Sequence, residues 1–224
     1  MKCFSFKLSG RLGHFRKFYT TASALSYDFP PPATIKGLIG AITGCKEYIS
    51  ATEGLKIGIV VEKLEGRLSF GLNLLNIKNR ERPIHTQAKR QILVKPSYII
   101  HVCGEGDLFE TFANMVQEGK SHYHPYLGKT SYPAFIEPIG FQEAKFCEKH
   151  NSICGVFSVE CICNPIELLK QGYVLKDRIP LSFQEGRQRP KYGDVFYKIE
   201  ARPLSGDFKN IYKIGADYVY LFSS

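Results

Sequence analysis

Three consecutive prolines, Pro30 to Pro32, place the strictest local constraint on how this chain folds. Proline lacks a backbone N–H and has a fixed φ, so a helix can start at the end of this run but cannot pass through it. Apolar residues then recur at helical spacing, at positions 35, 38, 39 and 42, and Gly44 follows them. The pattern predicts a short helix that begins near Thr34, which can cap it, and ends at Gly44.

Gly37 and Gly40 lie three residues apart inside this predicted helix. Each costs up to about 1 kcal/mol relative to alanine, so we expect a close neighbour on that face. That neighbour is either a sheet or the phosphate backbone of a nucleic acid. In either case Gly37→Leu is expected to disrupt folding by overpacking.

Alternating apolar residues predict strands on both sides of this helix. A second helix, expected over residues 108–117, has Asp107 and Glu110 in capping-box spacing. The strands are expected at residues 2–8, 57–64, 67–75, 97–102, 153–163, 194–200 and 210–222, with a short helix after Asn164-Pro165. The order of elements up to about residue 163 predicts an α+β chain with a ferredoxin-like (RRM-like) βαββαβ plan.

One strand in the region 57–75 exceeds this plan, and we assign it to an insertion. We therefore expect residues 1–140 to form the ferredoxin-like domain, with a basic insertion at about 76–96. Residues 141–224 would supply the completing strand and a small β-rich C-terminal subdomain. The sequence contains no internal repeat and no Gly/Ser-rich linker, so the two parts are expected to pack closely.

The composition, 44% hydrophobic and 23% charged, excludes a disordered chain. No window approaches the ~18 apolar residues of a membrane span, and the N-terminus lacks the apolar core of a signal peptide. These observations predict a cytoplasmic protein with no membrane partner.

Known catalytic and metal-binding motifs are missing from the sequence. The seven cysteines are odd in number and contain no C-x-x-C pair, which argues against disulfides and zinc. Cys161 and Cys163 are expected to share one face of a strand as small apolar side chains. No phosphate-binding or dinucleotide-binding loop, serine-esterase motif or zinc-protease motif occurs, so no metal and no cofactor are expected.

Positive charge is concentrated in a few segments. The net charge is +9, and residues 78–95 carry six Lys and Arg against one acidic residue, a net +5. Cations with interleaved apolar residues suit single-stranded nucleic acid, because the cations track phosphates while apolar groups stack on bases. The side chains expected to contact RNA are basic or histidine residues in or beside these segments: Arg11, His14, Arg16, Lys17, Lys36, Arg80, Arg82, His85, Lys89, Arg90, Lys129, Arg187, Arg189 and Lys191.

Residues 15–44, FRKFYTTASALSYDFPPPATIKGLIGAITG, resemble the N-terminal signature of CRISPR-associated protein family 5 of the RAMP superfamily. PYLGKTSYPA, residues 125–134, is similar to the mid-chain element of that family. The basic insertion corresponds in position to the family's thumb. The C-terminal third is similar only in being short and β-rich.

This resemblance implies a non-catalytic RNA-binding subunit of a type I CRISPR interference complex (Cascade), acting in antiviral defence. Such a subunit caps the 5′ handle of the crRNA and contacts the backbone subunit and the large subunit. Target DNA would be reached only through the complex, where guide base pairing supplies sequence specificity.

Two alternatives remain open. One branch of the family is a metal-independent endoribonuclease that processes precursor crRNA, with a catalytic tyrosine at the end of the first helix. This sequence has Ala41 to Gly44 there and no tyrosine, and the nearest set that could act is Tyr48, Lys120 and His122. The second alternative is a protein-interaction subunit that does not contact RNA.

Overall fold

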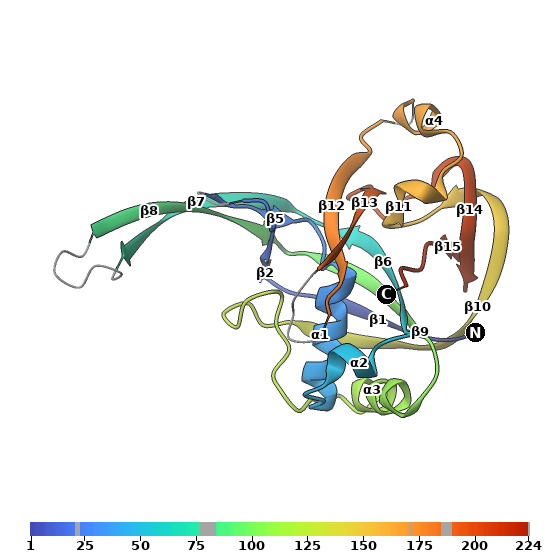
Figure 1. Ribbon diagram of the computed structural model, residues 1–224, viewed down its shortest axis with the longest axis horizontal. Coiled ribbons are helices and arrows are strands. Elements are labelled where there is room, and N and C mark those ends of the chain that lie inside the picture. The colour runs from blue at the N-terminus through green and yellow to red at the C-terminus, as the bar shows by residue number, and fades with distance from the viewer. Residues whose placement is uncertain (21–22, 77–83, 171, 185–189, 224) are drawn as a thin grey trace.

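A computed structural model describes residues 1–20, 23–76, 84–170, 172–184 and 190–223. The chain is mixed α/β, with many strands and few helices (Figure 1). Its main sheet has six antiparallel strands, here in spatial order: β15 (Asp217–Val219), β14 (Leu204–Ile214), β10 (Phe135–Ile153), β1 (Lys2–Ser9), β9 (Ser97–Cys103) and β6 (Lys56–Lys63). No described helix is long and apolar enough to cross a membrane.

Strand β1 lies in the middle of this sheet. Phe4, Phe6 and Leu8 alternate on one face, as the sequence predicts, and all three are buried. Phe4 and Phe6 both pack against Phe112 of α3 (Asp107–Gln117), with ring centroids 6.1 and 5.6 Å away. The alternation therefore sets which face of the sheet receives the helices.

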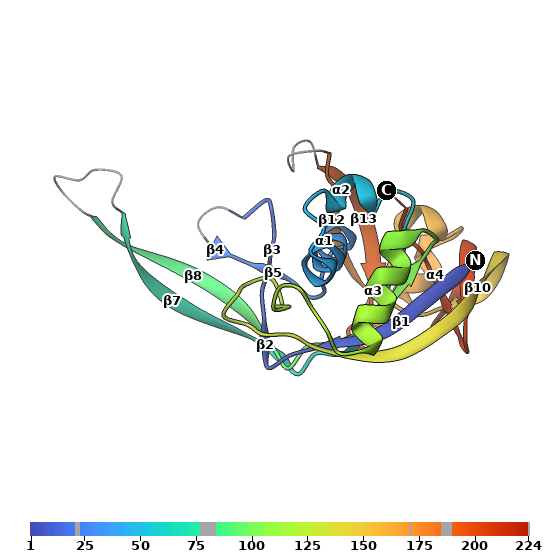
Figure 2. The same ribbon diagram turned by 90° about the horizontal axis from the view of Figure 1, so that it is seen from below.

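Helix α1 (Pro32–Thr43) lies beside α3 (Figure 2) and ends at Gly44, whose φ is 76°. It begins two residues before the expected Thr34, because proline is accepted in a first helical turn, where its missing N–H breaks no hydrogen bond. Helix α1 also contacts β12 (Leu175–Ser182) and β6. These several neighbours explain why most of the helix is buried. The short α2 (Tyr48–Ala51) follows.

A two-stranded hairpin projects from the body of the molecule (Figure 1). It consists of β7 (Gly66–Asn76) and β8 (Ile84–Val94), paired in continuous register. Four short strands pack at its base: β2 (Leu12–Gly13), β3 (Phe15–Arg16), β4 (Ser23–Ala24) and β5 (Ser26–Tyr27). The hairpin starts about ten residues before the expected insertion, because the surplus strand of the region 57–75 is its first arm.

Asp28 anchors the base of this hairpin. Its carboxylate accepts hydrogen bonds from Nε and Nη2 of Arg67, both 2.6 Å, and from the hydroxyl of Tyr197, 2.7 Å. Asp28 is almost fully buried, and Tyr197 lies in β13 (Lys191–Tyr197). The carboxylate thus links the hairpin to β13, since Tyr197 lies 130 residues after Arg67 in sequence.

The C-terminal part differs from the sequence-based expectation in its first strand. The region 153–163 was expected to be the fourth strand of the main sheet, but that strand is β10, which the sequence analysis missed. After Ile153, the last residue of β10, only β11 (Phe157–Ser158) is a strand in this region, and a 3₁₀ turn (Val159–Cys161) follows, capped by the Ser158 hydroxyl. The expectation that two cysteines share a strand face is therefore wrong: Cys161 is buried and Cys163 is exposed.

The remaining C-terminal elements agree with expectation only in part: β12 was not predicted, and the strand expected at 210–222 is divided between β14 and β15. The short helix after Asn164 is α4 (Pro165–Leu169). Strands β11, β13 and β12 form a small three-stranded sheet, while β14 and β15 extend the main sheet from β10. Strand β10 spans both parts, because residues 135–143 pair with β1 and residues 144–153 pair with β14.

Candidate nucleic-acid interface

Three cations from distant parts of the chain converge at the base of the hairpin. Arg16 comes from β3, Arg90 from β8 and Lys129 from the loop before β10. Burial, and then the positive charges of Arg90 and Arg16, lower the pKa of the Lys129 ammonium. Within the described part of the chain, none of the three pairs with a carboxylate. We call Arg16, Arg90 and Lys129 the basic cluster, and uncompensated charge of this kind attracts anions.

The loop that carries Lys129 is held against the backbone of His14. The His14 amide donates to the carbonyl oxygen of Leu127, 3.1 Å away. Gly128 has φ 80°, and a Cβ at this position would lie 1.9 Å from the His14 carbonyl oxygen. Only glycine permits this approach, so the glycine of the PYLGKTSYPA element fixes the position of Lys129.

His14 itself lies in the interior beneath the basic cluster. It is 3% exposed, and its Nδ1 donates to the carbonyl oxygen of Gln91, 2.7 Å away. Burial lowers the pKa of its imidazole, and Arg90, Lys129 and Arg16 lower it further, against the effect of the Gln91 hydrogen bond. His14 therefore supports the cluster from below.

Lys17 and Lys36, also expected at the RNA, are not presented to solvent as free cations. The Lys17 ammonium lies 2.6 Å from the buried carboxylate of Asp177. Burial opposes the change, but the hydrogen bond and charge of Asp177 raise the pKa of Lys17. Lys36 is 7% exposed on α1, and desolvation lowers the pKa of its ammonium.

The other expected contacts divide into two groups. Arg11, His85, Lys89 and Lys191 are exposed, with His85 and Lys89 on the hairpin. Arg80, Arg82, Arg187 and Arg189 lie outside the described residues.

Exposed aromatic side chains beside Arg16 were missed by the sequence analysis. Phe18 and Tyr19 are each about half exposed, and Phe18 stacks on Tyr192 of β13 with ring centroids 3.9 Å apart. Aromatic faces are what single-stranded bases stack on. The signal was present in the sequence, since FRKFY places two cations between aromatic residues.

Tyr48 and His122 pack on one face of α1. A Cβ at Gly40 would lie 2.5 Å from Cβ of Tyr48, and a Cβ at Gly44 would lie 2.7 Å from Cγ of His122. The His122 amide also donates to the carbonyl oxygen of Ile42, 2.8 Å. Tyr48 therefore covers Gly40 within the helix and His122 covers Gly44 at its end, although Tyr48 follows the helix in sequence.

Lys120, the third member of the nuclease alternative, forms an exposed ion pair. Its ammonium lies 2.8 Å from the carboxylate of Glu118. That carboxylate raises the pKa of Lys120. Among the described residues, no group of three or more potential ligands could hold a metal ion.

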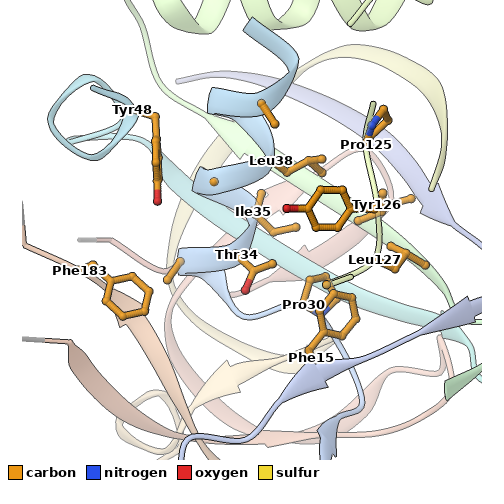
Figure 3. A pocket seen from close by; sticks show the side chains of 15 residues that line it. Phe15, Pro30, Thr34, Ile35, Leu38, Tyr48, Pro125, Tyr126, Leu127 and Phe183 are labelled. Atoms are coloured by element: carbon orange, nitrogen blue, oxygen red, sulfur yellow. The ribbon is translucent and has the colours of Figure 1, made fainter. Parts of the chain in front are cut away.

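A cavity of about 260 Å³ opens beside the first turns of α1 (Figure 3). Its walls are mostly apolar and aromatic: Phe15, Leu38, Tyr48, Tyr126, Leu127 and Phe183 are among them. Thr34 contributes a hydroxyl, and Tyr126 reaches across the front of α1 (Figure 3). The cavity thus lies between the helix, the loop that carries Lys129 and the end of β12.

Gly37 also lines this cavity. A Cβ there would have only Tyr48 near it, at 3.9 Å, which is an ordinary contact. The overpacking expected for Gly37 belongs instead to Gly40, where Tyr48 is in direct contact. The expectation named the wrong glycine of the pair because both lie at helical spacing and only the fold shows which one Tyr48 covers.

Comparison with known families identifies the chain. A family model described as "CRISPR-associated protein (Cas_Cas5)" matches residues 3–177. The chain belongs to this Cas5 family. The resemblance found in residues 15–44 and 125–134 is thereby confirmed. A search of curated proteins gave no match.

Two solved structures share the fold of this Cas5 protein. One, "CRISPR RNA-guided surveillance complex", is 14% identical over 92% of this chain and 91% of that chain, with a TM-score of 0.54. The other, "Crystal structure of a CRISPR protein from Archaeoglobus fulgidus", is 12% identical over 100% of both chains, with a TM-score of 0.56. At such identities the similarity concerns the fold alone.

The residues that match the Cas5 family include the basic cluster. Arg16, Arg90 and Lys129 all lie within residues 3–177. Phe183 and Lys191 lie beyond this range, in the part of the chain that the family model does not cover.

Proposed function

We propose that this Cas5 protein is a non-catalytic subunit of a type I CRISPR surveillance complex and caps the 5′ handle of the crRNA. The observation that carries the proposal is the convergence of Arg16, Arg90 and Lys129, to which no carboxylate among the described residues is paired. A phosphate backbone is a ligand that compensates several cations at once. Membership of the Cas5 family and the fold shared with a surveillance-complex chain support crRNA as that polyanion.

The proposal includes an assignment of the two parts of the fold. The spatial order β10, β1, β9, β6, with α1 and α3 packed together, supports a ferredoxin-like domain within residues 1–140. Residues 141–224 then complete the sheet and add the small C-terminal subdomain. The projecting hairpin is the thumb.

The thumb has two different faces. Exposed Leu68, Phe70 and Leu74 lie on one face, because side chains two residues apart in a strand point the same way. Arg90 shares this face, because it pairs with Phe70, whereas Lys89, His85 and exposed Leu75 lie on the other. In the proposed complex the exposed apolar side chains contact the backbone subunit, while Arg90 and Lys89 follow the RNA. The large subunit and the target DNA are reached through the assembly.

The proposal is tested with the full chain assembled with its backbone subunit. A repeat-derived handle RNA should bind more tightly than an unrelated RNA of equal length, and binding should weaken as salt rises. Equal affinity for the two RNAs would refute handle recognition. Unchanged RNA retention after Lys89→Ala and Arg90→Ala would favour a subunit that contacts only protein.

A second candidate function, metal-independent cleavage of precursor crRNA, is favoured by one specific observation. Tyr48 covers Gly40 and His122 covers Gly44, at the C-terminal end of α1, although no tyrosine lies at the end of the helix itself. A phenol and an imidazole at one end of a helix are groups that can transfer protons at a ribose hydroxyl. Lys120 lies two residues before His122 in sequence and would supply positive charge.

Repeat RNA incubated with the purified protein in EDTA separates the two functions. A single cut at the handle boundary that is lost in both His122→Ala and Tyr48→Phe would establish the nuclease. Intact RNA under these conditions supports the non-catalytic subunit.

A further inference from the structure

We propose that the cavity beside α1 receives one unstacked base of the bound RNA, while the basic cluster holds the flanking phosphates. This inference rests on the proposed RNA binding and adds a site for a base to it. Four aromatic rings, those of Phe15, Tyr48, Tyr126 and Phe183, line the cavity (Figure 3). Single-stranded RNA is commonly recognised by bases that turn out and stack on such rings.

The cavity and the basic cluster are joined through the chain. Phe15 and Gly128 line the cavity, and the next residues in sequence are Arg16 and Lys129. In β3 successive side chains point to opposite sides, so Phe15 is buried while Arg16 faces solvent. Arg16 and Lys129 therefore lie at the rim of an apolar cavity. A nucleotide bound there would place its base in the cavity and its phosphate beside these cations.

The size of the cavity limits what it can hold. Its volume of about 260 Å³ is below the range of about 300–1,000 Å³ for pockets that enclose drug-sized ligands. A space of this size is enough for one planar ring system. The Thr34 and Tyr126 hydroxyls give a base edge hydrogen-bonding groups amid apolar walls.

An apolar side chain of a partner protein is the competing occupant. The charge at the rim favours RNA, because Arg16, Arg90 and Lys129 have no carboxylate partner among the described residues and would repel a basic protein. An apolar side chain would fill the cavity but would leave the positive charge of these cations without a counter-charge.

The test uses handle RNAs in which each nucleotide in turn is made abasic, so that the phosphates are kept and one base is lost. With the wild-type full chain, removal of the base at one position should lower the affinity for the RNA roughly tenfold, since stacking of a base on aromatic side chains is a strong and local contribution. Removal of a base at any other position should have a smaller effect.

Gly37→Leu is the decisive variant, because its side chain enters the cavity from α1 where there is room beside Tyr48. It should bind intact RNA and the critical abasic RNA equally, at the affinity that the wild type shows for the abasic RNA. Gly37→Ala, which adds a single methyl group, should reduce the discrimination less. Melting temperatures confirm that both variants are folded.

Several outcomes overturn the inference. If every abasic RNA binds the wild type as the intact RNA does, no base enters the protein. If Gly37→Leu keeps the discrimination, the base is bound elsewhere. If it leaves RNA binding unchanged but weakens association with the backbone subunit, the cavity holds a protein side chain. Failure of all RNAs to bind is different, because it removes the proposed function itself.

Discussion

The basic cluster makes a quantitative prediction about Lys129→Ala. On single strands each phosphate contact contributes about 0.7 to the slope of log affinity against log salt. Loss of one contact should flatten the slope by about 0.7. The affinity should then fall about fourfold at about 0.15 M salt and about eightfold at about 0.05 M, if the contact vanishes at about 1 M. Removal of all three cations should flatten the slope by about 2.

The assay is fluorescence anisotropy of a labelled handle RNA titrated with the full chain at several KCl concentrations. Lys149→Ala is the matched control, because it removes the same charge from an exposed position on β10 that pairs with β14, away from the hairpin. Its slope should equal that of the wild type. The reasoning fails if Lys129→Ala keeps the wild-type slope, or if Lys149→Ala flattens it equally, since net charge would then explain the binding.

Three further predictions concern stability. Gly40→Ala should lower the free energy of unfolding by about 1–2 kcal/mol, because the new methyl group clashes with Tyr48. Gly37→Ala should instead raise the free energy of unfolding by up to about 1 kcal/mol. Urea denaturation of the two variants measures both changes. Asp28→Ala should cost about 2–3 kcal/mol, and a loss below 1 kcal/mol would contradict its anchoring role. Because the folded-state pKa of His14 is lowered, its contribution is complete above the unfolded pKa of about 6.5 and is lost as pH falls towards the folded value. Melting temperatures across this range should therefore fall more steeply for wild type than for His14→Gln.

Elements whose signal lies within a few residues could be predicted from the sequence. The proline run and Gly44 bounded α1 to within two residues, and the capping-box spacing located α3. Strand β10 was missed because Pro138 and Gly140 interrupt its pattern. In the structure the register shifts there opposite Ser5 and Phe6, so the sheet accommodates the interruption with an irregularity that local reasoning does not detect.

The residue types of the candidate site could be predicted from the sequence, but their arrangement could not. The sequence indicated which segments are basic, yet it gave no reason to assign Lys17 and His14 a different role from Arg16. Their roles depend on Asp177, 160 residues from Lys17, and on the backbone of Gln91. A cation with a buried partner and a cation without one look the same in sequence, because only the tertiary fold supplies the partner.

The loop that carries Lys129 has a consequence for the thermodynamics of binding. Besides its contact with His14, it is closed on itself, since the Leu127 amide donates to the carbonyl oxygen of Tyr132 and the Ala134 amide to that of Pro125. Its backbone is therefore ordered when the protein folds, before any ligand arrives. Association then immobilises little more than the lysine side chain, so the entropic penalty at this position is small. Dissociation should accelerate when the loop is loosened, even if every positive charge is kept.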